Sequence, residues 1–143
     1  MPDTKYNDLS VAKFINYIMD SGKKGVAEKI FYSAMDIIHK KTKTDGIKIF
    51  KKGIENTSPS VEVKSRRIGG ATYQVPIEVP KKRAFYLASL WIINASKNSS
   101  GKPMSEKLAS ELIAAANGDG NAIKKKEDTH RMADANKAFA HFR

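Results

Sequence analysis

The stretch from Ser60 to Val79 constrains the fold most, because it is the one part of the chain with the alternation of a β-strand. Valines at 61 and 63 alternate with charged residues, and a second alternating run follows from Tyr73 to Val79. Gly69 and Gly70 lie between the runs and supply the positive φ angles of a tight turn. The pattern predicts a β-hairpin. Two strands alone are marginally stable in water, so the rest of the chain must hold the base of this arm.

The two alternating runs also constrain the turn. If Val63 shares a face with Tyr73, Val75 and Ile77, directly opposed residues have position numbers with an even sum, as in Val63 opposite Val75. A two-residue loop would set Val63 opposite Pro76 and place the apolar rows on opposite faces. We therefore expect a loop with an odd number of residues, about three or five, or a bulge. An arm that is apolar on both faces is the competing explanation.

Apolar residues elsewhere recur at helical spacing and predict about six helices, with the hairpin between the third and fourth. Their expected starts are Asn7 or Asp8, the residues after Lys23-Lys24, Asp45, Pro80, Pro103 and Asn121. We expect residues 39–44 to form a loop. We expect the sixth helix to run to Phe142, with a basic N-terminal half and with its apolar residues, Met132, Ala135, Phe139 and Ala140, mostly in the second half. The prediction is a mainly α fold: a single domain over residues 1–143 with a protruding β-arm at about 60–79.

The net charge of +11 and the pI near 9.8 indicate an anionic partner: nucleic acid first, then an anionic membrane, then acidic proteins. The charge is unevenly distributed. It is +4 over residues 60–83, zero over 84–119 and +3 over 120–143. We therefore expect a basic arm and a basic C-terminal end, separated in the sequence by a neutral stretch that forms core.

No constellation for catalysis or metal binding can be assembled from the sequence. The chain has no cysteine, which excludes disulfides and thiolate zinc sites, and it contains no apolar run of membrane-spanning length and no signal peptide pattern. His39, His130 and His141 lack metal-ligand spacing, although Asp134 is spaced to pair with His130 on a helix. We expect no cofactor, no metal, no small-molecule substrate and no membrane partner. An RNA-modifying enzyme ranks third, after an RNA-binding structural protein and a DNA-bending protein.

Three groups of basic residues are candidate nucleic-acid contacts. Charged residues at a hairpin tip can merely keep its edge from pairing with other chains, and a basic helix face can simply be solvated. The groups would nevertheless form a stripe along the arm and a second patch on the sixth helix, as on a phosphate-tracking surface. They are Lys64, Arg66 and Arg67 at the tip, Lys81, Lys82 and Arg83 at the base, and Lys124, Lys125 and Lys126.

Two tyrosines have alternative roles. Tyr73 and Tyr86 could stack on unpaired bases, as aromatic residues do in single-stranded RNA sites. Each falls on an apolar row, however, and an aromatic residue at such a position more often packs against its neighbours. We expect both to pack.

Several segments together resemble the small-subunit ribosomal protein seven family, of the bacterial and organellar type. They are KYNDLSVAKFINYIMDSGKK, VEVKSRRIGGATYQVPIEV with the helix of Trp91 after it, and MSEKLASELIAAANGDGNAIKKKEDTHRMADANKAFAHFR. The resemblance runs in order from about Pro2 to Arg143. Members usually carry a basic arm ahead of the segment that matches Pro2 to Tyr6; Met1 stands in its place, and without that arm we expect weaker rRNA binding.

The resemblance implies a structural, non-enzymatic protein that binds the 3′ major domain of small-subunit rRNA and nucleates assembly of the subunit head. It implies rRNA, exit-site tRNA and neighbouring proteins of head and platform as partners, and a cytoplasmic ribosome, with an organellar one as the alternative. By matching position, Ile68, Gly69, Gly70 and Ala71 are candidates for tRNA and platform contact. The implied rRNA-facing residues are Lys23, Lys24, Lys64, Arg66, Arg67, Lys81, Lys82, Arg83, Lys124, Lys125, Lys126, His130 and Arg131.

The alternative function is that of a DNA-bending architectural protein whose β-arms clasp the minor groove as a dimer. The arm has no wedge proline at its tip, and a large helical segment follows it. Both features favour RNA binding over DNA bending.

Overall fold

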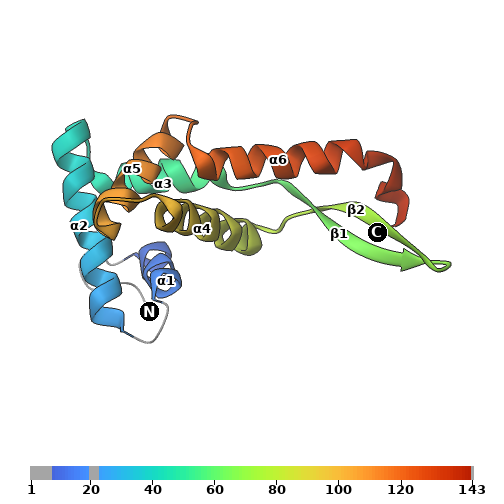
Figure 1. The fold of residues 1–143 in the computed structure, drawn as a ribbon, viewed down its shortest axis with the longest axis horizontal. Coiled ribbons are helices and arrows are strands. Elements are labelled where there is room, and N and C mark those ends of the chain that lie inside the picture. Colours follow the sequence, from blue (N-terminus) through green and yellow to red (C-terminus); the bar gives the residue numbers. More distant parts are fainter. Residues whose placement is uncertain (1–7, 20–22, 143) are drawn as a thin grey trace.

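The computed structural model describes residues 8–19 and 23–142, which form a helical body and a hairpin that projects from it (Figure 1). The mainly α prediction is confirmed, with the hairpin between α3 and α4. In order, the elements are α1 (Leu9–Ile18), α2 (Lys24–Thr42), α3 (Gly46–Thr57), β1 (Val61–Ile68), β2 (Ala71–Glu78), α4 (Lys81–Asn98), α5 (Met104–Ala116), α6 (Asn121–Ala135) and a 3₁₀ helix, η1 (Lys137–Phe142).

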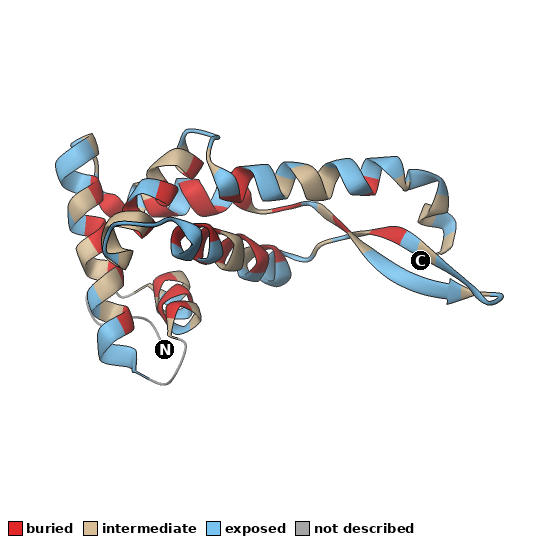
Figure 2. Cartoon of the chain, viewed as in Figure 1, coloured by how far each residue is buried: buried red, intermediate tan, exposed pale blue. Residues whose placement is uncertain are grey.

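The core of the body is built around three phenylalanines from the first three helices. Phe14, Phe31 and Phe50 are fully buried, and their ring centroids lie 4.9 to 5.8 Å apart in tilted or edge-to-face pairs. These are the separations that aromatic pairs prefer. Helices α4 and α5 add Ile92 and Leu112, so the neutral stretch does supply core, as expected. Buried residues gather in the body, whereas most of the arm is exposed (Figure 2).

Local signals set most helix starts. The carboxylate of Asp8 accepts the backbone N–H of Ser10 at 2.8 Å and caps α1, and it also pairs with Lys51 of α3 at 2.7 Å. Asp45 caps α3 in the same way, accepting the N–H of Ile47 at 3.1 Å.

Helix α2 is longer than the sequence predicts. It continues through the polar run to Thr42 and stops at Lys43, which has a φ of 61°. The prediction of a loop over residues 39–44 is therefore wrong for its first four residues. Lysine is a good helix former, and the last turn of a helix favours basic residues, so polarity alone did not mark a break here.

The hairpin has a two-residue turn, and the prediction of an odd loop or a bulge is wrong. Ile68 pairs with Ala71 and Val63 pairs with Pro76, without interruption along both strands. Gly69 and Gly70 have φ angles of 57° and 85°, the positive values that a type I′ turn requires at both central positions. This turn matches the natural twist of the strands, so local turn chemistry set the register.

The competing explanation for the alternation, an arm apolar on both faces, holds near the base. Val75 and Pro76 are neighbours in β2 and point to opposite faces, and both are buried. The register also places Pro76 opposite Val63 in a pair without ladder hydrogen bonds, so its missing N–H leaves the ladder intact. Helix α6 packs on both strands and η1 packs on β2, so the hairpin has apolar partners outside its own two strands.

The sixth helix ends earlier than expected. Helix α6 stops at Ala135, and the chain continues as η1, which folds back onto β2 (Figure 1). The amide of Asn136 donates to the carbonyl of Met132 at 2.8 Å, a local bond that competes with helix continuation. Met132 and Ala135 are exposed, and Ala133 is buried. Within the described residues, no helix combines the length and apolar character that crossing a membrane needs.

Candidate nucleic-acid interface

The tip of the arm carries exposed basic side chains. Lys64 and Arg66 lie on one face of the ribbon and Arg67 on the other, all of them solvent-exposed. None of the three forms an ion pair within residues 8–19 and 23–142. The tip therefore presents unneutralised charge on both faces, as a contact to phosphate groups requires.

The turn forms the outer end of the arm. Gly69, Gly70 and Ala71 are exposed, and Ile68 is half-buried. Nothing in the described chain packs over Gly69 or Gly70, because a side chain built on either glycine would meet no atom within 4 Å. The predicted contact residues for tRNA and the platform thus form the most distant point of the hairpin (Figure 1).

A two-pronged ion pair fixes the arm to α4. Arg83 donates from Nε and from a terminal nitrogen to the two carboxylate oxygens of Glu62, at 2.8 and 3.0 Å. This hydrogen bond is the main reason that the pKa of Arg83 is raised further above its ordinary value. The Glu62 side chain is only 11% exposed, and no other cation pairs with it in the described chain. Arg83, predicted as an rRNA contact, therefore has a structural partner already.

Helix α6 holds the other side of the base. The backbone N–H of Ser60, just before β1, donates to Nε2 of His130 at 3.1 Å. Burial, and next the positive charge of Lys126, lower the pKa of His130, which favours the neutral ring that this contact needs. The spacing of His130 and Asp134 allows a helical pair, but this pair does not form. Oδ1 of Asp134 lies 4.0 Å from Nζ of Lys137 instead.

Lys126 ties α6 to the end of α3. Its ammonium group donates to the backbone carbonyl oxygen of Asn56, in the last turn of α3, at 2.8 Å. Carbonyls in the last turn of a helix lack intrahelical partners, and the helix dipole favours a cation there. Asn56 in turn donates from its amide to the carbonyls of Ala115 and Ala116 at the end of α5. Lys126 therefore has a structural contact, unlike Lys124 and Lys125, which are exposed.

The start of α6 is held by a buried carboxylate of α5. Glu111 accepts the backbone N–H of Ala122 at 3.2 Å. A side chain of the preceding helix therefore caps the start of α6. Burial raises the pKa of Glu111. A side chain at Gly120, whose φ is 96°, would lie 2.6 Å from the Glu111 carboxylate oxygen, so this position requires glycine. Sequence reasoning missed Glu111, as it missed Glu62.

Aromatic residues of η1 cover the middle of β2. The ring of Tyr73 lies 5.1 Å from that of Phe139 and 4.9 Å from that of Phe142. The expectation that Tyr73 packs is confirmed, although its partners come from η1 and its cross-strand neighbour is Arg66. Tyr86 also packs, edge-on to Tyr17 at 5.4 Å, while remaining 38% exposed.

The predicted contact residues fall into two places. The groups on the arm, at the start of α4 and on α6 lie along the hairpin and its base, and Arg131 there is paired with Asp128. Lys23 and Lys24 lie at the start of α2, at the opposite end of the body from the hairpin (Figure 1). The structure therefore joins the first three groups to one region but leaves Lys23 and Lys24 apart.

Within the described ranges, no three His, Asp or Glu side chains gather as a metal site would require.

Comparison with known proteins identifies the family of the chain. The model of the family described as "Ribosomal protein S7p/S5e" matches residues 1–137 of the chain. The chain belongs to this family. It is 57% identical to the "Small ribosomal subunit protein uS7" of Gemmatimonas aurantiaca over 143 residues, covering 100% of this chain and 92% of that protein. It is 58% identical to the protein of the same name from Thermotoga petrophila over 142 residues, covering 99% and 92%.

Proposed function

We propose that this chain is a structural, non-enzymatic component of the small ribosomal subunit that binds rRNA. Membership of the S7p/S5e family supports the ribosomal role, and the relatives that match over nearly their whole length are named as proteins of that subunit. It would thus act within the ribosome, among rRNA and other ribosomal proteins.

The observation that carries RNA binding is the contrast between tip and base of the arm. The cations at the tip have no ion-pair partners in the described chain, whereas Arg83 at the base is bound to Glu62. Fixed charges that project from a stable body can neutralise phosphates of two RNA segments that would otherwise repel each other. Recognition would depend on RNA shape, because side chains cannot read the narrow major groove of an A-form helix.

The finer roles extend this proposal. The chain would bind the 3′ major domain of the rRNA early and organise the head of the subunit, with the turn at 68–71 directed toward exit-site tRNA and a platform protein. The exposed turn at the outer end of a braced arm supports a contact of this kind, since it is accessible to a partner.

A binding comparison at one salt concentration tests the proposal. The intact chain is titrated with a 3′ major domain rRNA fragment and with duplex DNA of equal charge. We expect clear preference for the rRNA and a footprint confined to a few helices of it. Equal affinity for both would contradict the proposal and favour the DNA-bending alternative.

A further inference from the structure

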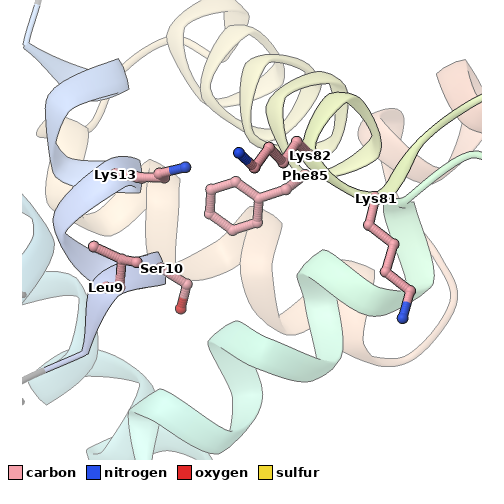
Figure 3. Close-up of a pocket in the computed structure, with 6 residues that line it drawn as sticks. All are labelled: Leu9, Ser10, Lys13, Lys81, Lys82 and Phe85. Atoms are coloured by element: carbon pink, nitrogen blue, oxygen red, sulfur yellow. The ribbon is translucent and has the colours of Figure 1, made fainter.

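An unassigned pocket lies between the first turns of α1 and α4, beside the base of the arm. Its volume is about 350 Å³, and its lining is mostly apolar. It is lined by Leu9, Ser10, Lys13, Lys81, Lys82 and Phe85 (Figure 3). Leu9 is 54% exposed, one of few large apolar side chains in the described chain that is so open to solvent. The pocket therefore offers an accessible apolar surface with an aromatic ring at its centre.

Positive charge surrounds this apolar surface. Lys13 of α1 and Lys82 of α4 point toward one another beside the ring of Phe85 (Figure 3). Neither forms an ion pair with any residue in the ranges 8–19 and 23–142. The carboxylate of Asp8 at the start of α1 is held by Lys51 and Ser10 instead. Two ammonium groups that converge without a counter-charge favour an anion between them.

We propose that the pocket takes one unpaired nucleotide of the bound RNA. Its base would lie against Phe85 and Leu9, and its phosphate between Lys13 and Lys82. A flat apolar group joined to an anion is the chemistry of a nucleotide, and proteins commonly hold unstacked RNA bases on aromatic side chains. The inference rests on the proposed RNA binding and adds to it: the arm contacts phosphates, whereas this pocket holds a base.

The test compares two RNA probes of equal charge. The intact chain is titrated at low salt with a four-nucleotide uridine RNA and with the same chain of ribose phosphates lacking bases, and NMR signals of Leu9 and Phe85 are followed. We expect both signals to shift with the uridine RNA, which should bind about tenfold more tightly than the abasic probe because of the base contact. Equal affinities, shifts confined to the arm, or no binding of either probe would each overturn the proposal.

Variants separate the lysine pair from general charge. Lys13→Gln with Lys82→Gln should weaken uridine RNA binding about tenfold and lower the salt slope by about 0.7, the value for one single-strand phosphate. The matched control, Lys40→Gln with Lys41→Gln, removes two exposed charges from the last turn of α2 and should change affinity less than about twofold. Equal effects of the two pairs would contradict a specific site.

The ring itself is tested by Phe85→Leu, which keeps the site apolar. Phe85 also packs near Tyr17, at 6.2 Å, so thermal unfolding is measured beside binding. We expect the preference for the uridine RNA over the abasic probe to disappear. If rRNA fragment binding survives while no variant affects this preference, the pocket proposal fails and the proposed function stands. If the rRNA fragment itself does not bind, the function fails.

Discussion

The body and the arm of this protein are stabilised by different kinds of contact. The body buries complete apolar side chains, including three phenylalanines with no exposed surface. The outer arm is mostly exposed. Its base combines apolar packing against α6 and η1 with directional polar contacts: Glu62 to Arg83 of α4 and Ser60 to His130 of α6. The difference shows that residues which stabilise the fold and residues which present charge form largely separate sets. Mutation can therefore disable one without the other.

The two attachments also explain how a thin hairpin keeps a direction. One contact comes from α4, the helix that follows the arm, and the other comes from His130 of α6, which lies 70 residues after its partner Ser60. A ribbon held from two sides resists bending at its base better than one held by its own strands.

The largest effect should come from opening the core of the body. Phe50→Ala removes a fully buried ring in contact with Phe14 and Phe31, and we expect it to lower the free energy of unfolding by about 3–5 kcal/mol. Tyr73→Ala on the arm removes a ring that is only half-buried and should cost about 1 kcal/mol. Chemical denaturation measures both, and equal losses would contradict the distinction between body and arm.

The next effect comes from the base of the arm. Arg83→Ala leaves the buried carboxylate of Glu62 without its partner, and we expect a loss of about 1–2 kcal/mol, with faster amide exchange in β1 and β2. Glu62→Gln keeps the shape and one acceptor, so its cost should be smaller. If both variants match the unchanged protein in exchange rates, the ion pair does not hold the arm.

Acid should weaken a contact within the body. Burial alone would raise the pKa of Asp8, but hydrogen bonds from Lys51, Ser10 and Val11 outweigh it and lower the pKa to about 2. Because the unfolded value is 3.8, the stabilisation is present above about pH 4 and is lost as the pH falls toward 2. Allowing for solvent screening, we expect a loss of about 1–2 kcal/mol. Asp8→Asn should remove this part of the acid dependence in denaturation curves.

A smaller pH effect should appear at the arm. The lowered pKa of His130 means that its contribution is fully present above pH 6.5, the unfolded value, and is lost as the pH falls through the lower folded value. A protonated Nε2 cannot accept the Ser60 N–H, so amide exchange at Ser60 should accelerate on acidification, with at most about 1 kcal/mol lost. His39→Gln is the control, and exchange at Ser60 that ignores pH in the unchanged protein would contradict the contact.

Features with a local cause could be predicted from the sequence. Asp45, Pro80 and Pro103 mark helix starts because caps and proline act within one turn, and the predicted starts are confirmed. The basic tip could likewise be identified from the turn glycines and the charges beside them.

Features that depend on partners outside the local segment could not be predicted from the sequence. The prediction of the register is wrong because the alternation does not serve one buried face: Val75 and Pro76 point to opposite faces of β2, and both are buried. The paired glycines, typical of a two-residue turn, were the better signal. Glu62 and Glu111 were missed because their partners lie 21 and 11 residues away, at no periodic spacing.

The most direct test of the account uses Arg66→Gln with Arg67→Gln at the tip. We predict that the slope of log affinity for the rRNA fragment against log salt falls by about 1.4–1.8, two phosphate contacts, while the free energy of unfolding changes by less than about 0.5 kcal/mol. An unchanged slope, or a loss of stability comparable to that of Phe50→Ala, would contradict the claim that the arm binds RNA and the body supports it.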